Sequence, residues 1–377
     1  MVPGMRTGAP LPRRGQGQAE MLMRIGIVSY PMLFQREAAL QHQIGETTRA
    51  LNALREHAGV KLEVELVDPH CSDLDGYDLI HVFSAGAGNY RIVEAAAALG
   101  IPLVLSPLIS SGWDRSCGEQ ARQTDHRLGK QTAWSGQSSY AQTRHALQLA
   151  NVIVALGEGE KKAIEEGFLI DSAKIRVLAH GVSAPWFEAD GDLFRQRTGM
   201  RTPFVLMAGP ISPYQGQLSM AETLSSLALP LILLGETRER DQDYLRQVRA
   251  LRGVSCLGGL AHDSRMLASA YAAASVVVLP CQGDACARTM FDALATGTPV
   301  VMSAASQVDI AHSSFALRRV AWDDAGAQQQ AVLALVAQPP ARDAVRALVR
   351  PFTWERAALQ VAGCYLEQVA SGSALSA

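Results

Sequence analysis

The fold is decided by two neighbouring stretches of the chain, Tyr271-Ala-Ala-Ala-Ser-Val-Val-Val-Leu-Pro280 and Asp292-Ala-Leu-Ala-Thr-Gly-Thr-Pro-Val-Val301. The first contains a short β-branched run, 276–279. A second such run, 299–303, follows an apolar helical segment and a glycine. Runs of this kind are typical of strands buried on both faces of a parallel sheet. The two stretches therefore predict a βαβ unit in a doubly wound α/β sheet.

The same alternation continues on both sides of this unit. Further strands are predicted at residues 24–30, 61–67, 78–83, 102–106, 151–155, 174–178, 203–208, 229–234 and 254–257. Helical segments lie between them, and one from about Asn89 to Leu99 ends at Gly100, a residue type that often ends helices. The pattern predicts two successive α/β domains in a chain of 377 residues.

We predict four segments along the chain. Residues 1–22 contain arginines, prolines and glycines but no apolar segment of a signal peptide, so we expect a disordered tail, with Met23 opening the first strand. Residues 23–186 form the first domain, and 187–350 the second, which begins with a polar, linker-like stretch. Residues 351–377 form a C-terminal crossover helix and tail.

The composition excludes several classes of protein. Hydrophobic residues make up 48% of the chain and charged residues 19%, which is typical of a folded protein. The net charge of −2 gives no indication of nucleic-acid binding. The six cysteines contain no C-x-x-C motif, so we interpret them as buried apolar residues in a reducing cytoplasm. The chain has no unbroken apolar stretch long enough to predict a membrane span.

Three parts of the chain resemble retaining glycosyltransferases of family 4. Residues 150–159 with 173–182 are similar to the hinge-side end of that family's first domain, and 207–217 resemble the opening strand and loop of its second. The two stretches quoted first resemble its donor-binding core. The final Phe352-Thr-Trp-Glu-Arg356 resembles the start of its crossover helix. The resemblance implies the GT-B fold, with two Rossmann-like domains facing across a cleft.

The resemblance also implies an activity. The protein would be a hexosyltransferase of polysaccharide biosynthesis that transfers a sugar, with retention, from a nucleotide-diphosphate sugar to a glycan, lipid or protein acceptor. The nucleotide sugar is the substrate, and neither a cofactor nor a metal ion is expected. The implied location is cytoplasmic, with a peripheral position at the inner face of the membrane left open. The oligomeric state is not implied.

A pair of carboxylates marks the implied donor site. The family's two glutamates, eight positions apart, fall on Asp284 and Asp292, so the spacing is kept while each side chain loses one methylene, roughly 1.5 Å of reach. The resemblance implies that Asp284 is catalytic and contacts the sugar, and that Asp292 contacts the ribose. The alternative is that both are solvated or helix-capping residues.

The cations that the family uses to hold the diphosphate are replaced. Their positions hold Pro210 and Gln215, which carry no charge. Arg288 is the nearest candidate to compensate, although at i, i+4 spacing it could instead pair with Asp284 or Asp292. The remaining predicted donor-binding positions are Gln215, Gly209, Gly216 and Thr298.

The first domain carries a weaker resemblance. The Gly-Gly of one branch of the family falls on Ala38-Ala39, and alanine is strained where a loop needs a positive φ. The predicted acceptor and phosphate loop residues are Gln41, Gln43, Ser84 and Gly86. His81 is the second predicted catalytic residue, with a satisfied structural histidine as the alternative.

Two alternatives stay open. The polar, tryptophan-containing segment 111–145 is predicted to be helical, either as an acceptor-facing or membrane-facing surface or as a solvated helix face.

Because the departures from the family's motifs concentrate at the implied donor site, a catalytically inactive, glycosyltransferase-like binding or scaffold protein is the second hypothesis for function. A sugar-phosphate epimerase or phosphorylase on the same fold is a third.

Overall fold

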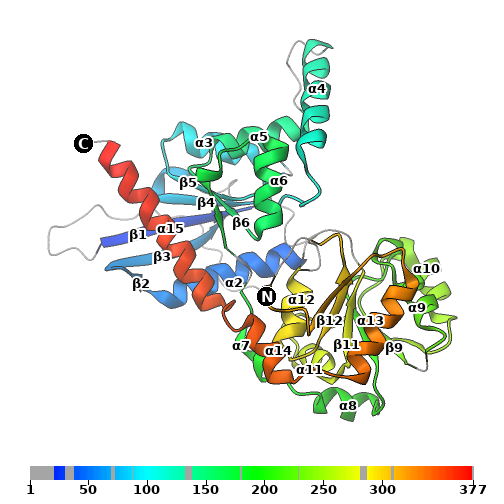
Figure 1. Cartoon of the computed structure of the whole chain (residues 1–377). Coiled ribbons are helices and arrows are strands. Elements are labelled where there is room, and N and C mark those ends of the chain that lie inside the picture. The colour runs from blue at the N-terminus through cyan, green and yellow to red at the C-terminus, as the bar shows by residue number, and fades with distance from the viewer. Residues whose placement is uncertain are drawn as a thin grey trace. The chain divides into compact units, whose positions relative to one another are not determined.

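The computed structural model divides into two compact units, one formed by Met1–Ala179 with Trp354–Ala377 and the other by His180–Thr353. Each unit has one β-sheet with helices on both faces (Figure 1), which confirms the predicted pair of Rossmann-like α/β domains. The structure describes residues 21–29, 38–68, 73–86, 88–131, 138–178, 181–227, 229–280, 287–306 and 310–375.

The observed bounds differ from the predicted ones. The first strand already begins at Met21, and residues 1–20 of the predicted tail lie outside the described part of the chain. The second unit begins before residue 187, because Trp186 is buried in its core. The expected linker 187–202 contains a helix, Asp192–Thr198, whose Phe194 is fully buried. The buried Phe194 therefore anchors this polar stretch in the core of the second unit.

The first unit contains a seven-stranded sheet. Its strands are β1 (Met21–Val28), β2 (Glu56–His57), β3 (Val60–Val67), β4 (Leu79–Phe83), β5 (Leu103–Ser106), β6 (Val152–Ala155) and β7 (Ile175–Val177). They lie in the order β2-β3-β1-β4-β5-β6-β7, and β2 pairs antiparallel with β3 at the edge. The chain order reverses between β1 and β4, which places a topological switch point there.

Helices cover the first sheet on both faces. They are α2 (Ala38–Leu54), α3 (Tyr90–Ala98), α4 (Arg115–Gln131), α5 (Ser139–Leu149), α6 (Glu158–Phe168) and α15 (Trp354–Leu375), with the 3₁₀ turns η1 (Leu74–Gly76) and η2 (Ser172–Lys174). One core joins α2 and α15 to the sheet, and another joins α3, α5 and α6 to its other face (Figure 1). Packing on α2 therefore places the C-terminal helix in the first unit.

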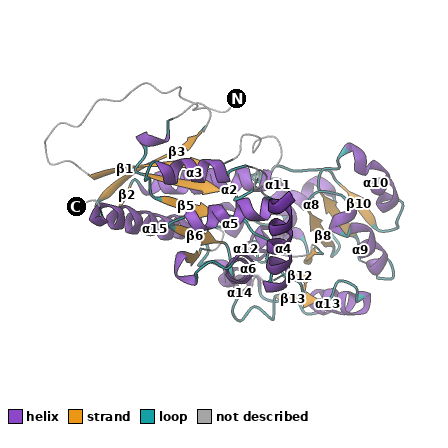
Figure 2. Ribbon diagram, turned by 90° about the horizontal axis from the view of Figure 1, so that it is seen from above, coloured by secondary structure: helices purple, strands orange, loops and turns teal. Residues whose placement is uncertain are grey.

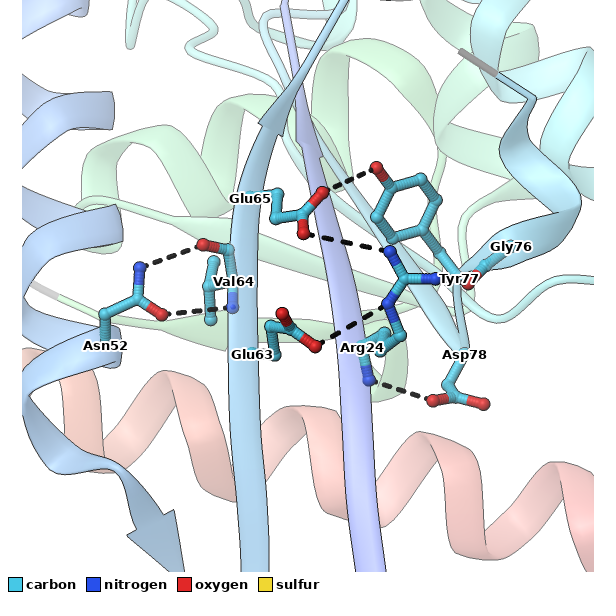
Figure 3. A network of polar contacts seen from close by, with 8 residues as sticks. All are labelled: Arg24, Asn52, Glu63, Val64, Glu65, Gly76, Tyr77 and Asp78. Atoms are coloured by element: carbon cyan, nitrogen blue, oxygen red, sulfur yellow. Dashed lines mark hydrogen bonds and ion pairs between the residues drawn. The ribbon is translucent and has the colours of Figure 1, made fainter. Parts of the chain in front are cut away.

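A polar network on β1 and β3 stabilises the strands beside this switch point (Figure 3). The guanidinium of Arg24 lies 3.7 Å from carboxylate oxygens of both Glu63 and Glu65, and it donates to the carbonyl of Gly76 at 2.9 Å. It also lies over the ring of Tyr77, 5.2 Å from the ring centroid. Burial, together with the charge and hydrogen bond of Glu65, raises the pKa of Tyr77 to about 12. The network joins β1, β3 and the segment that leads into β4.

The second unit contains a six-stranded sheet whose strand pairs are all parallel. Its strands are β8 (Val205–Ala208), β9 (Leu231–Leu234), β10 (Val254–Cys256), β11 (Val276–Leu279), β12 (Val300–Ser303) and β13 (Leu317–Val320). The order is β10-β9-β8-β11-β12-β13, so the chain order reverses between β8 and β11. This is the second switch point.

The helices of the second unit also form two layers, one on each face of its sheet. In both units the strands therefore lie between helices (Figure 2). The helices of the second unit are α7 (Ala184–Glu188), α8 (Asp192–Thr198), α9 (Gln217–Leu224), α10 (Gln242–Arg249), α11 (Arg265–Ala273), α12 (Ala287–Ala295), α13 (Ala325–Ala337) and α14 (Arg342–Val349), with η3 (Pro213–Gln215) and η4 (Glu239–Asp241). One core contains residues of α7, α8, α11, α12 and α14, and the other contains residues of α9, α10 and α13.

The segment 111–145, predicted to be helical, contains α4 and the start of α5, and the residues at the start of α4 pack against the rest of the first unit. The ring of Trp113 packs against those of Tyr140 and Phe168, with centroids 5.5 Å and 5.0 Å apart. A Cβ atom on Gly118 would lie 2.1 Å from the carbonyl oxygen of Gly167, so α4 and α6 cross in close contact. Trp113 is therefore a packing residue and not a free surface aromatic. Trp134 lies outside the described residues.

Within the described part of the chain, none of the helices combines the length and apolar character needed to cross a membrane.

Candidate functional site

The switch point of the second sheet is the natural place for a ligand. In open α/β sheets, ligands bind outside the carboxyl ends of the strands where the strand order reverses. Here β8 ends at Ala208 and β11 at Leu279, so Gly209 and Pro280 lie directly at this position. The side chains around these two residues form the candidate site of the second unit.

The loop after β8 depends on two glycines that were predicted to bind the donor. Gly209 has a φ of 146° and Gly216 a φ of 67°, both in the region that L-residues with side chains rarely adopt. A Cβ atom on Gly216 would lie 3.1 Å from the indole nitrogen of Trp322 and 3.2 Å from Cβ of Pro280. The loop therefore packs closely onto Pro280 at the end of β11, and glycine is required at both positions by the backbone conformation.

Two side chains that were not among the predicted site residues, Gln217 and Tyr244, fix the start of α9 by hydrogen bonds. The amide of Gln217 donates to the carbonyl of Pro210 at 2.8 Å. The hydroxyl of Tyr244 accepts from the backbone N–H of Leu218 at 2.9 Å and lies 3.3 Å from the amide oxygen of Gln217. Together they tie α9 to the loop and to α10. The predicted contact Gln215 ends the turn η3 and is half-buried.

An exposed aromatic side chain also marks this loop. Tyr214 is 85% exposed, the largest exposure among the large hydrophobic side chains that the structure describes. It directly follows Pro213, whose fixed φ favours the first position of a turn. An aromatic ring held out at the carboxyl edge of a sheet can stack on a planar or sugar ligand.

Asp292 is buried and paired with a histidine. Its exposure is 4%, and its carboxylate lies 2.8 Å from Nε2 of His262, which is in the loop after β10. The ring of His262 packs against Trp186, with centroids 5.2 Å apart. Oδ2 of Asp292 is thus engaged by His262, whose side chain is more exposed than the carboxylate that it contacts.

Arg288 lies near the start of α12 and is not paired with Asp292. Its Nη1 atom is buried and has no hydrogen-bond partner within the described residues. Burial first, and then the charge of Asp292, raise the pKa of Tyr271, while the charge of Arg288 lowers it, so both charges lie close to that ring. Of the two i, i+4 pairs considered for Arg288, the one with Asp292 is not formed, and Asp292 is paired with His262 instead. Among the described residues Arg288 therefore has no ion-pair partner, while a pair with Asp284 lies outside them.

Two further predictions for this unit have different outcomes. Asp284, the predicted catalytic carboxylate, lies outside the described residues and stays a prediction. Thr298 is fully buried, donates to the carbonyl of Tyr271 at 2.8 Å and accepts from Arg342 at 3.3 Å. It lies two residues before β12, at the amino edge of the sheet. Its assignment to donor binding is therefore corrected to a structural role.

His81 has a structural environment in the first unit. It is 1% exposed, and its ring nitrogens lie 2.7 Å from the hydroxyl of Tyr365 and 2.9 Å from that of Ser106. Burial lowers the pKa of His81 to about 3. Because both nitrogens are engaged inside the core, this histidine has no nitrogen left to contact a substrate. Its predicted catalytic role is corrected to one of packing.

The other predicted residues of the first unit lie near its switch point. Gln41 and Gln43 belong to the first turns of α2 and not to a loop. The preceding Ala38-Ala39 is helical as well, so alanine is suited to this place and no positive φ is needed. Ser84 follows β4 with a φ of 71°, and its hydroxyl accepts from the N–H of Gly86 at 3.3 Å.

Strained backbone marks the same edge of the first sheet. Ser84 and Leu108, which follow the adjacent strands β4 and β5, both have a positive φ, 71° and 57°. Such conformations cost roughly 1–3 kcal/mol for non-glycine residues and are frequent at functional sites. The buried side chain of Asn89 stabilises the turn by donating to the carbonyls of Phe83 and Ser84, both at 2.9 Å. This edge is the candidate binding edge of the first unit.

Among the side chains that the structure describes, no group of three or more His, Cys, Asp or Glu residues is arranged to hold a metal ion. The prediction that no metal is required remains untested by this observation.

Comparison with known proteins assigns the fold. A family model described as "Glycosyl transferases group 1" matches residues 202–338, and no curated protein matches. A glycosyltransferase from Rickettsia africae has a TM-score of 0.65 at 12% identity, with 93% of this chain and 99% of that chain covered. Sucrose-phosphate synthase from Thermosynechococcus elongatus has 0.65 at 16%, with 93% and 100% covered. HepE from Anabaena, in complex with UDP, has 0.64 at 18%, with 92% and 100% covered. The fold is GT-B.

The GT-B assignment and the family match cover different parts of the chain. The structural likeness extends over both units, whereas the family match lies within the second unit. The matched residues include the loop from Gly209 to Gly216 and all of α12. The segment that carries the family signal is therefore the one that builds the candidate site at the second switch point.

Proposed function

We propose that the protein is a retaining glycosyltransferase that takes its sugar from a nucleotide-diphosphate sugar. The observation that carries the proposal is the placement of Arg288, near the start of α12, and of the Gly209–Gly216 loop, after β8, at the carboxyl edge of the second sheet, inside the segment that matches the glycosyltransferase model. The solved structure of HepE, which shares the GT-B fold, is a complex with UDP. That complex supports a nucleotide donor for this chain as well.

The proposed donor site assigns a task to each group. The leaving diphosphate develops negative charge, which Arg288, the start of α12 and the glycine loop would stabilise. His262 and Asp292 act as one unit that contacts the ribose side of the nucleotide, in place of a free carboxylate. Asp284 remains the proposed contact to the transferred sugar, and no metal ion is required.

The acceptor is proposed to be a glycan, a lipid or a protein, bound by the first unit. The support is the strained carboxyl edge of its sheet, where Ser84 and Gly86 lie, and the start of α2, which carries Gln41 and Gln43. Reaction in the cytoplasm stays part of the proposal. The packed Trp113 does not support a membrane-facing surface at α4.

One observation favours a second candidate function, that of a nucleotide-sugar-binding protein without catalysis. Asp292 is buried and paired with His262, and the positions of the usual diphosphate cations hold the uncharged Pro210 and Gln215. A site with a single cation would bind the diphosphate but stabilise its departure less.

Turnover of the donor separates the two candidates. The purified full-length chain is incubated with nucleotide-diphosphate sugars of several bases, and release of the nucleotide diphosphate is followed over many enzyme equivalents. The transferase proposal expects multiple turnovers with at least one donor, and the anomeric NMR signal of the product should keep the configuration of the donor. Binding without turnover, with a panel of glycan and lipid acceptors present, would support the non-catalytic function.

Removal of the Arg288 cation should weaken nucleotide binding. Arg288→Ala is expected to lower the affinity for the nucleotide diphosphate by about 1.5–3 kcal/mol, the value of a hydrogen bond to a charged group. Isothermal titration calorimetry measures this loss. Arg201→Ala, which removes an exposed arginine before β8, is the matched control and should leave the affinity unchanged. Equal affinities for the two variants would remove Arg288 from the site.

A further inference from the structure

A cavity of about 410 Å³ lies beside the candidate site, at the carboxyl ends of β8, β9 and β10. Its apolar walls include Ile211, which follows β8, and Leu245 of α10. Its polar lining includes Glu236, which follows β9, and Arg249 at the end of α10. The volume lies within the range of small-molecule sites, about 300–1,000 Å³.

Glycines shape this cavity and place the carboxylate. A Cβ atom on Gly259 would lie 2.4 Å from Cγ and 3.2 Å from Oε1 of Glu236, so the Glu236 side chain lies directly on the backbone at Gly259. Gly258, the residue before it, has a φ of 84°. The backbone N–H of Ile211 donates to the carbonyl of Glu236 at 2.9 Å. This hydrogen bond joins Glu236 to the segment that follows β8.

The two charges of the cavity are not paired. Glu236 and Arg249 are both exposed, and within the described part of the chain neither forms an ion pair or a side-chain hydrogen bond. The arginines next to them are engaged elsewhere, since Arg240 pairs with Asp241 and Arg246 with Asp243. A carboxylate and a guanidinium thus line one cavity without meeting, and each keeps its hydrogen-bonding groups for a ligand.

We propose that this cavity binds the base of the donor nucleotide and that it selects guanine, an inference that rests on the proposed glycosyltransferase function. Guanine has two adjacent donors, N1–H and the N2 amino group, which match the two oxygens of a carboxylate. It also has the adjacent acceptors O6 and N7, which arginine binds in a bidentate manner. Both charged groups of the cavity therefore find a partner on the same base.

The other bases fit this pair of charges less well. The single N3–H donor of uracil lies between two carbonyl oxygens. The carboxylate of Glu236 would repel both of these oxygens. The amino groups of adenine and cytosine each lie beside a ring nitrogen acceptor, so the second carboxylate oxygen of Glu236 would face a lone pair. Neither adenine nor a pyrimidine offers the O6/N7 pair to Arg249. The predicted donor class is accordingly a guanosine-diphosphate sugar.

Calorimetric titration of the full-length protein with GDP, UDP, ADP and CDP tests the inference. GDP should bind about tenfold or more tightly than the other three. Glu236→Gln, which keeps the size of the side chain but has only one acceptor oxygen, should weaken GDP binding about 10- to 100-fold without weakening UDP binding, because the repulsion of the uracil carbonyls is removed. Arg249→Met should also reduce the preference for GDP. Glu239→Gln, an exposed glutamate on η4, is the matched control and should change nothing.

The outcomes separate this inference from the function on which it rests. Tighter binding of UDP, ADP or CDP than of GDP overturns the guanine assignment while leaving a nucleotide-dependent transferase intact. A preference for GDP that survives both Glu236→Gln and Arg249→Met overturns the cavity as the base site. Binding of none of the four nucleotides, or of their sugars, to a folded protein overturns the proposed function itself.

Discussion

Replacement of Gly235 by alanine is expected to disrupt the second unit at its binding edge. A Cβ atom on this residue would lie 1.8 Å from the carbonyl oxygen and 2.7 Å from the carbonyl carbon of Gly209, and backbone atoms cannot move aside as a flexible side chain can. The extended ends of β8 and β9 are joined here by the hydrogen bond from Gly209 N–H to the carbonyl of Leu234, 2.9 Å long. The substitution would have to separate them.

The expected loss of stability for Gly235→Ala is about 3 kcal/mol, at the upper end of overpacking effects. It corresponds to a fall in melting temperature of roughly 6–12 °C for a domain of this size. Nucleotide binding should be lost even at temperatures where the variant is folded, because the Gly209 loop moves. Gly326→Ala, on the exposed side of α13, is the control and should keep both stability and binding. Wild-type behaviour of Gly235→Ala would contradict the close approach of the two strands.

Stability should fall steeply in acid because of His81. Burial holds its pKa near 3 in the folded protein, whereas an unfolded chain takes up the proton near pH 6.5. Between these values the unfolded state binds more protons than the folded state, so stability decreases as the pH falls. The slope for one such group approaches about 1.4 kcal/mol per pH unit below pH 6.5, where the unfolded histidine becomes fully protonated, and the loss between pH 6.5 and pH 4.5 is about 2.3 kcal/mol.

Urea denaturation as a function of pH measures this contribution. His81→Gln should start from a lower stability, since Tyr365 and Ser106 lose a partner, but its stability should depend less on pH in the range 6.5–4.5. His312→Asn replaces an exposed histidine with a positive φ by a residue that tolerates this backbone, and it should keep the wild-type slope. An unchanged slope in His81→Gln would assign the acid sensitivity to other groups.

The strands of both sheets could be predicted because their sequences are simple. Runs such as 276–279 and 231–234 are apolar, short and buried on both faces, and the structure places them in parallel pairs. Less regular elements were not predicted. The sequence Leu317-Arg-Arg-Val320 carries two charges, yet it pairs with β12 as the edge strand β13, where side chains can reach water.

The site could be predicted only in part, because it depends on contacts between distant residues. His262 reaches Asp292 across 30 positions, and no local pattern marks the loop after β10 as its source. The partners of His81 are 25 and 284 positions away. Without them, a histidine at a strand end is equally consistent with catalysis and with packing.

Thr298 shows a different source of error. It lies next to the glycine turn that carries the resemblance, and closeness in sequence suggested closeness to the donor. The helix α12 runs from the carboxyl edge of the sheet back to its amino edge, so residues after its end lie at the edge opposite to the candidate site. Arg288 is at the start of that helix and so stays within reach of the donor.

The central claim is that a nucleotide-diphosphate sugar binds at the switch point of the second sheet. Hydrogen exchange of the full-length protein, followed by mass spectrometry with and without saturating nucleotide diphosphate, tests it most directly. The account predicts slower exchange in residues 209–218, in 258–262 and at the start of α12, with little change in β12 and β13. Protection confined to the first unit, or to the amino edge around Thr298, would contradict it.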